Sequence, residues 1–375
     1  MDASEARPAD AFKVALEADQ LVVEFGRILE PASSGGAAAV GVADRVVLPL
    51  EVARRLASRL GDCLRPFQSA IAAEEAKLLS PAQAALAARA GQEATRAPNN
   101  EAGERAAQLL RLVGDLGVPY QYERSFRICD HALMANRFLL TLDVADLGDS
   151  ASARTLEIGD RLGMPGSARQ IAEANLAMAR SIHFGFEADD NAIICKLYLE
   201  RCVEAPELQR ARSEGAPVLL HLALKWDVTK GTAVTTRYHW RPALSLAEIE
   251  ARLAHVYRDG PQTSLDLARA VLDLTKGRVA PEQLQYLEVE EAENDRRSFD
   301  LNLYNARLQV SDMQPLLHRM REHFNVRPGR VQALYDQIRD KALGHLAGGI
   351  HRNGQDFFNI YYGVVGLPYF NRQLR

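Results

Sequence analysis

From residue 100 onward, pairs of predicted β-strands alternate with pairs of predicted helices, and this order constrains the fold more than any other feature. Short polar turns such as Asn353-Gly354 join the two strands of a pair, which is typical of antiparallel hairpins rather than of a strand–helix–strand parallel sheet. The expected strand pairs are 119–129 with 136–146, the two halves of 183–200, 218–228 with 233–242, 283–293 with 297–308, and 343–352 with 356–365. The expected helices are 101–117, 152–162, 167–181, 245–260, 264–277, 311–324 and 329–342.

An antiparallel sheet of about ten strands tends to curl or to close on itself. Because every helical segment after the first follows a strand pair, the helices are expected to cover one side of that sheet. The sequence therefore predicts an α+β fold, in which helices surround an antiparallel β-barrel of about ten strands built from αββα repeats.

Each predicted strand has one apolar face and one face that mixes cations, tyrosine, asparagine and histidine. In the strand CKLYLE, Lys196, Tyr198 and Glu200 share one face, while cysteine and leucine occupy the other. The apolar faces must meet the helices, so the mixed faces either meet water, as in many open antiparallel sheets, or line a barrel interior. We favour the interior, because these faces carry few solubilising residues and place one cation at a time on successive strands.

Composition excludes several classes of partner. The net charge of -4 gives no basic surface for nucleic acid or an acidic membrane. No apolar run approaches the roughly 20 residues of a membrane helix, and the polar N-terminal segment lacks an apolar signal core. The four cysteines form no CxxC pair, which fits a reduced, cytoplasmic location.

The first part of the chain has a different character. Residues 1–87 predict a small αβ domain, with two strands before residue 31, a strand from Arg45 to Leu50 and a helix after it. Residues 88–102 are small and polar and predict a linker, so that residues 103–375 form the barrel. Dimerisation or docking of a partner is the expected role of the N-terminal domain.

Two segments resemble the ABBA aromatic prenyltransferases, specifically the indole type that includes the dimethylallyltryptophan synthases. RLVGDLGVPYQYERSF, residues 111–126, is similar to that family's helix and Gly-x-Pro turn before the first strand. FGFEADDNAIICKLYLE, residues 184–200, is similar to its hairpin with a Lys-x-Tyr strand. The resemblance spans roughly residue 100 to the C-terminus. It implies the family's barrel, the PT barrel, and transfer of a prenyl group from an allylic diphosphate, such as dimethylallyl diphosphate, to an aromatic acceptor.

The resemblance implies roles for particular residues. Lys196 and Arg137 would bind the diphosphate. The same role falls to Arg237 and His239, which stand where the family has an Arg-x-Lys-x-Tyr strand; here histidine replaces the lysine and the tyrosine is missing. The charge of the diphosphate adds Lys225 to this group. Tyrosine rings would shield the allyl cation and exclude water. The implied shielding and neighbouring interior residues are Tyr198, Tyr304 and Tyr361, with Asn302 and Asn359 beside them.

A carboxylate is needed to orient the aromatic acceptor and to accept its proton. The family's acidic residue after the Gly-x-Pro turn is Gln121 here, but Glu123 shares its face and takes the role in our interpretation. Glu187 is the other candidate. The acceptor is expected to be an indole, a tryptophan or a peptide side chain.

No cofactor is expected, and enough Lys and Arg side chains are present for Mg²⁺ not to be required. The chain has no DDxxD motif. No metal site is expected either; one built from His221, His239, His345 and His351, which lie on separate strands, is the weaker alternative. The charge run 288–297 is expected to be an exposed turn. A barrel that has lost catalysis and serves as a binding or scaffold protein is the alternative to an enzyme.

Overall fold

The computed structural model describes residues 11–17, 20–30, 39–49, 100–189, 191–291, 294 and 296–365. The chain divides into two compact units, Met1–Lys77 and Leu78–Arg375. The helix expected after residue 50 and the linker expected at 88–102 lie largely outside the described residues, so the boundary at residue 87 stays a prediction.

The N-terminal unit contains a three-stranded antiparallel sheet in the order β1-β2-β3. Its strands are β1 (Ala11–Glu17), β2 (Gln20–Glu30) and β3 (Ala39–Pro49). Strands were expected before residue 31 and from Arg45, and the third strand begins six residues earlier than expected, at Ala39.

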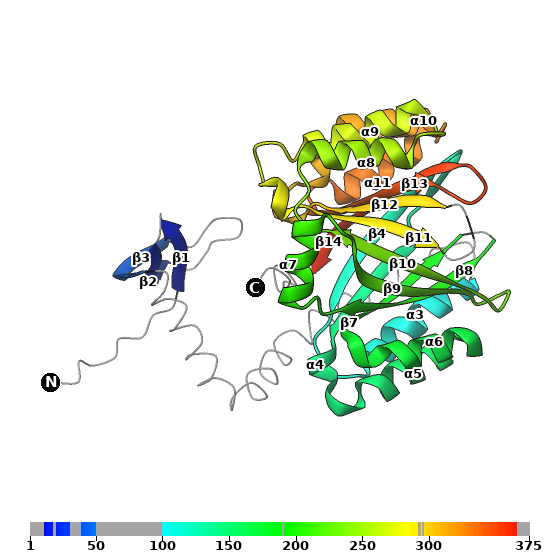
Figure 1. Ribbon diagram of the computed structural model, residues 1–375, viewed down its shortest axis with the longest axis horizontal. Helices are drawn as coiled ribbons and strands as arrows, with labels where there is room; N and C mark the ends of the chain where they lie inside the picture. Colours follow the sequence, from blue (N-terminus) through cyan, green and yellow to red (C-terminus); the bar gives the residue numbers. More distant parts are fainter. Residues whose placement is uncertain are drawn as a thin grey trace. The chain divides into compact units, whose positions relative to one another are not determined.

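The second unit is built on one eleven-stranded antiparallel sheet that closes through pairing of its last strand with its first (Figure 1). The strand β5 pairs only with β4, so the other ten strands form the barrel. The predicted barrel is confirmed. Its strands are β4 (Gln121–Cys129), β5 (Ala132–Met134), β6 (Arg137–Asp143), β7 (Ala179–Ala188), β8 (Ile193–Arg201), β9 (Val218–Asp227), β10 (Thr232–Arg241), β11 (Gln285–Glu291), β12 (Arg297–Asn302), β13 (Leu343–Ile350) and β14 (Asp356–Val365).

The helices other than α7 pack on the outside of the barrel in two groups (Figure 1). One group covers β6 to β9 and the other covers β11 to β14. The α-helices are α3 (Asn100–Gly114), α4 (Val144–Leu147), α5 (Ala151–Arg161), α6 (Gly166–Asn175), α7 (Ala205–Glu214), α8 (Leu246–Val256), α9 (Gln262–Asp273), α10 (Gln314–His323) and α11 (Pro328–Ile338). Short 3-10 turns are η2 (Gly148–Ser150), η3 (Leu176–Met178), η4 (Pro281–Gln283), η5 (Tyr304–Ala306) and η6 (Val310–Met313). No described helix is long and apolar enough to span a membrane.

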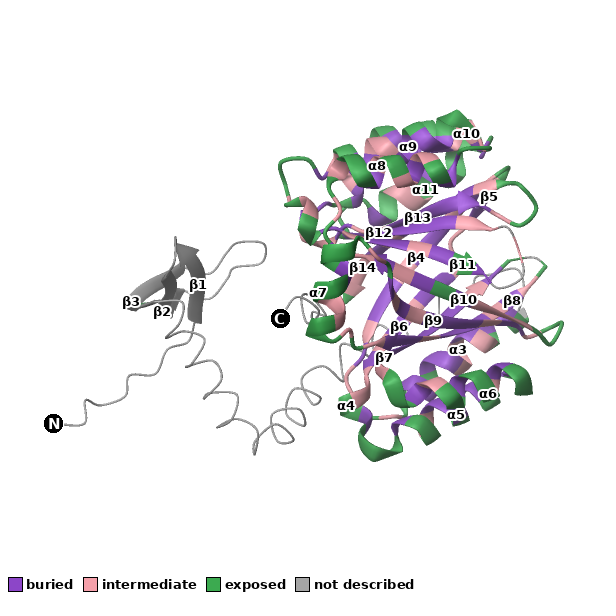
Figure 2. Ribbon diagram, in the orientation of Figure 1, coloured by how far each residue is buried: buried purple, intermediate pink, exposed green. Residues whose placement is uncertain are grey.

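Two apolar cores lie between the outer strand faces and these helices, where Figure 2 shows buried residues along the strands and on the inward stripes of the helices. Phe184 and Trp226 belong to the first core, Phe299 and Phe358 to the second, and all four are essentially inaccessible to solvent. Alternation along each strand then directs the opposite side chains to the barrel interior. Because the apolar strand faces pack against the helices outside the barrel, the mixed faces must line its interior.

The helix α7 was not predicted from the sequence. It separates β8 from β9, and its Leu208 packs with Val203 against an inner apolar cluster that includes Tyr238 and Trp240. It therefore lies over the end of the barrel at which β8 finishes, while the turns of the hairpins β7–β8 and β9–β10 lie at the other end (Figure 1).

Candidate active site in the barrel interior

The interior side chains of neighbouring strands form three levels, because each strand contributes every second residue. The level nearest the hairpin turns is mainly cationic, the middle level is uncharged and contains tyrosine, leucine and small residues, and the level toward α7 carries acids and histidines. On β8 these levels are Lys196, Tyr198 and Glu200. In the same direction, the interior residues of the other strands are Arg127, Ser125 and Glu123 on β4; Arg137, Leu139 and Thr141 on β6; Glu187, Gly185 and His183 on β7; and Lys225, Ala223 and His221 on β9. Because the strands are staggered, residues of one level are not always register partners: Lys196 lies opposite Gly185 in the register, but its side chain contacts Glu187.

The cationic level is organised around the carboxylate of Glu187. This group forms ion pairs with Arg137 and with Lys196, the latter at 2.6 Å between Nζ and Oε2. Burial by itself disfavours the charged carboxylate, but the two cations outweigh burial and hold the pKa of Glu187 well below its usual range. Burial also lowers the pKa of the Lys196 ammonium to about 8. Glu187 was predicted to orient the acceptor, but its position among these cations and its low pKa make it a poor proton acceptor.

Lys225 lies directly opposite Lys196 in the pairing of β8 with β9. Its ammonium lies over the ring of Tyr238, 5.6 Å from the centroid, and it forms no ion pair with any side chain in the described part of the chain. Burial, together with the charges of Arg296 and Lys196, holds the pKa of Lys225 well below its usual range. Like charges on directly paired residues repel, so this level is built to receive an anion.

Arg127 and Arg296 complete the cationic level, and sequence reasoning missed both. Their guanidinium groups lie over the ring of Phe357 at 5.0 and 5.5 Å from its centroid, and Arg127 also donates to Asn359 Oδ1 at 2.9 Å. Arg296 pairs with Glu291 at 3.1 Å. The run 288–297 was expected to be an exposed turn, and this is wrong for Glu291 and Arg296, which are 2% and 10% exposed in their side chains. Arg127 could have been found from its alternation with the apolar residues Phe126 and Ile128 along the strand. Arg296 lies in a turn, where no such alternation exists.

Tyrosine rings occupy the middle of the interior. Tyr198 and Tyr238 lie 5.7 Å apart between centroids, and Tyr361 lies 5.5 Å from the ring of His345. Burial is the main cause that raises the pKa of all three phenols, so they stay protonated at neutral pH. Tyr238 was not among the residues predicted for the interior.

Glu123 is buried at the third level and accepts a hydrogen bond from the Tyr304 hydroxyl. Burial is the main cause that raises its pKa, in opposition to this hydrogen bond and to His345. Gly344 makes room for the pair, because a Cβ there would collide with the carboxylate and with the hydroxyl. A buried carboxyl with a raised pKa is suited to accept a proton near neutral pH.

His345 and Asp300 lie beside this pair and were not predicted as site residues. Their Nδ1 and Oδ1 atoms are 2.8 Å apart, and the ring of His345 stands edge-on to that of Tyr304 at 5.2 Å. Burial alone would lower the pKa of His345, but Asp300 outweighs burial and raises it to about 9. The third level therefore holds a neutral or anionic Glu123 next to an imidazolium–carboxylate pair.

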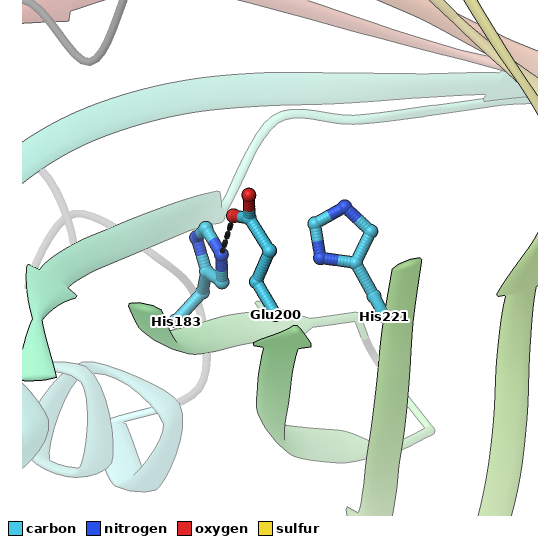
Figure 3. Close-up of side chains that lie close together, drawn as sticks. All are labelled: His183, Glu200 and His221. Atoms are coloured by element: carbon cyan, nitrogen blue, oxygen red, sulfur yellow. Dashed lines mark hydrogen bonds and ion pairs between the residues drawn. The ribbon is translucent and has the colours of Figure 1, made fainter. Parts of the chain in front are cut away.

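A second polar group at this level consists of His183, Glu200 and His221 (Figure 3). His183 Nε2 lies 3.0 Å from Glu200 Oε2, and its Nδ1 lies 2.8 Å from the Thr141 hydroxyl. The four histidines considered from the sequence do not gather: of these, only His221 belongs to this group.

The predicted placement of Arg237 and His239 inside the barrel is wrong. Arg237 pairs in register with Glu290 and is exposed, and His239 lies 3.6 Å from Glu290, on the outer face of β10. Tyr238, between them, pairs with His221 and points inward. Both faces of β10 are mixed in composition, so the sequence pattern did not distinguish the inner from the outer one.

The remaining predicted residues are Gln121, Asn302 and Asn359. Gln121 begins β4 opposite Thr141 in the register. Asn302 ends β12, and its Oδ1 accepts the backbone N–H of Tyr304, which positions the turn that carries this tyrosine. Asn359 accepts a hydrogen bond from Arg127 Nε and thereby orients the guanidinium group of Arg127.

The barrel has the fold of the ABBA aromatic prenyltransferases. It is similar to 5-dimethylallyltryptophan synthase from Streptomyces coelicolor, with a TM-score of 0.50 and 12% identity over 73% of this chain and 94% of the synthase. A structure of that synthase in complex with DMASPP and Trp matches with a TM-score of 0.46 and 10% identity over 73% and 91% of the two chains. AnaPT from Neosartorya fischeri matches with a TM-score of 0.45 and 13% identity over 70% and 88%. No protein-family model and no curated protein sequence matches the chain.

Proposed function

We propose that this chain is an aromatic prenyltransferase of the indole type, which transfers a prenyl group from an allylic diphosphate to an aromatic acceptor. The observation that carries the proposal is the succession of levels on adjacent strands, with a cationic level directly followed by a tyrosine level. The fold shared with a dimethylallyltryptophan synthase supports it.

The diphosphate would bind at the cationic level. Lys225 and Lys196 would donate charged hydrogen bonds to its oxygens, each worth about 1.5–3 kcal/mol, with Arg137, Arg127 and Arg296 adding charge. These side chains neutralise the diphosphate without a divalent cation, so we propose that Mg²⁺ is not required. Glu187 holds Arg137 and Lys196 in place as the anion arrives.

The allyl group would lie at the tyrosine level. When the carbon–oxygen bond breaks, its electron pair stays on the diphosphate and an allyl cation remains. The faces of Tyr198, Tyr238 and Tyr361 can stabilise such a cation by roughly 0.5–2 kcal/mol each. Their rings also exclude water, which would otherwise capture the cation.

The acceptor would bind toward the third level, with its N–H or O–H group directed at Glu123. The aromatic carbon attacks the allyl cation, and the ring then loses the proton from the attacked carbon. Glu123, held by Tyr304 and with a raised pKa, is placed to anchor the acceptor and to accept the proton that the ring loses. An indole, free or in a peptide, provides both the N–H group and the electron-rich carbon.

The test is a mass-spectrometric screen of tryptophan, other indoles, phenols and indole-containing peptides with dimethylallyl, geranyl and farnesyl diphosphate, in the presence of EDTA. We expect one acceptor to gain the mass of a prenyl group. Arg137→Met should lower turnover at least tenfold, while Arg237→Met is the matched control, because it removes the same charge from the outer face of the barrel. Binding of dimethylallyl S-thiolodiphosphate without any product from the whole panel would favour a barrel that binds but does not catalyse.

A further inference from the structure

His183, Glu200 and His221 come from three adjacent strands, β7, β8 and β9, and meet inside the barrel (Figure 3). One nitrogen from each imidazole and one carboxylate oxygen all lie within 4.8 Å of one another. The Glu200 carboxylate lies between the two rings, whose centroids are 5.6 Å apart. The proposed prenyl transfer uses none of these three side chains.

The spacing is close to that of ligands around one metal ion. Two ligand atoms, each about 2.1 Å from a tetrahedral ion, lie about 3.4 Å apart. His183 Nε2 and Glu200 Oε2 are 3.0 Å apart, so small rotations of the side chains would bring this pair, and then His221, to such an ion.

The surroundings also match a metal site. The Thr141 hydroxyl at His183 Nδ1 orients the ring so that Nε2 faces Glu200, as outer hydrogen-bond partners do for metal-bound histidines. Nδ1 of His221 is buried and has no hydrogen-bond partner among the described residues.

Acidic side chains gather at the same place. Glu200 is only 1% exposed, and its Oε2 faces Nε2 of His183 at 3.0 Å, so a carboxylate oxygen and an imidazole nitrogen already converge in the buried interior. Glu123 and Asp300 add further carboxyl groups at this level of the interior, and Asp300 is paired with His345. The site lies four residues along β8 from Lys196, or about 13 Å of extended strand, so an ion here is not one that accompanies a diphosphate at the cationic level.

We propose that His183, Glu200 and His221 bind a first-row divalent transition metal ion such as Zn²⁺. Two imidazoles and one carboxylate suit such ions better than Mg²⁺ or Ca²⁺, which prefer oxygen ligands throughout. Three protein ligands leave one coordination position open toward the interior, for water or for a nitrogen or oxygen atom of a bound molecule. This inference does not rest on prenyl transfer.

The experiment uses the full chain, stripped with EDTA and dialysed into chelator-free buffer. Zn²⁺ is titrated by calorimetry, and Co²⁺ is added as a spectroscopic probe, because its visible absorption reports the number and type of ligands. We expect one high-affinity equivalent of Zn²⁺, a Co²⁺ spectrum of four- or five-coordinate nitrogen–oxygen ligation, and a higher Tm with Zn²⁺.

His221→Ala should weaken Zn²⁺ binding at least a hundredfold and remove the Tm increase. It is the informative variant because Nδ1 of His221 makes no hydrogen bond to the described residues whose loss would unfold the barrel. His345→Gln is the matched control: it removes another imidazole of the same level, outside the group, and should change the affinity by less than about threefold.

Absence of stoichiometric Zn²⁺ binding, or binding that His221→Ala leaves intact while Tm shows a folded protein, would overturn the proposal. Either result leaves the proposed transferase untouched, since the product screen is run in EDTA. Conversely, a negative product screen has no bearing on the Co²⁺ spectrum.

Discussion

Replacing Lys225 with methionine should stabilise the free protein and at the same time weaken diphosphate binding. The ammonium of Lys225 faces Lys196 across the β8–β9 pair and forms no ion pair with the described residues, and its pKa is well below its usual range. Methionine fills a similar volume without the charge. A lysine whose pKa is lowered on folding costs stability below its unfolded pKa, so the variant should have a higher Tm at neutral pH.

With a diphosphate bound, the same ammonium becomes favourable. Loss of one charged hydrogen bond costs about 1.5–3 kcal/mol, and each 1.4 kcal/mol is a factor of ten, so the Kd should rise about tenfold to a hundredfold. The assay is calorimetric titration with dimethylallyl S-thiolodiphosphate, alongside thermal unfolding of the free protein. The two measurements should move in opposite directions.

Lys230→Met is the control, because Lys230 is an exposed lysine in the turn that follows the same strand and pairs with Asp227. It should leave the Kd unchanged and should not raise the Tm. Lys196→Met should also weaken binding but should lower the Tm, since it removes a cation that pairs with Glu187. An unchanged Kd in a folded Lys225→Met protein would refute the assignment of this level to the diphosphate.

Three further outcomes are expected. Glu123→Gln should lower turnover by about a hundredfold to ten-thousandfold without changing the Kd for dimethylallyl S-thiolodiphosphate, because only the acceptor's proton is affected; a comparable loss of diphosphate affinity would contradict this. The affinity for that analogue should fall as the pH rises through about 8, where Lys196 loses its charge. Binding at pH 8 should take up protons, which calorimetry in buffers of different ionisation enthalpy measures. An affinity that stays constant from pH 7 to 9 would contradict this role of Lys196. Deletion of residues 1–87 should leave a cooperatively unfolding barrel, and an unfolded product would place the domain boundary elsewhere.

The sequence alone determined the barrel and the inner position of several site residues. Hairpin turns and two-residue alternation are local properties, so the order of paired strands and the shared face of Lys196 and Tyr198 follow from the chain itself. Where the opposite face is uniformly apolar, as on β8, the helices leave only one choice of inner face. The resemblance to the ABBA prenyltransferases in two short segments pointed to the same fold.

Only the tertiary structure decided what the alternation left open. On β10 both faces are mixed, and the register with β9 and β11 turns Tyr238 inward and Arg237 outward. Arg296 joins the cations from a segment without strand alternation, and Glu187 pairs with Arg137 because the register sets those two residues opposite each other. The meeting of His183, Glu200 and His221 likewise depends on the stagger between three strands, because pairing register is a long-range property that no local spacing encodes.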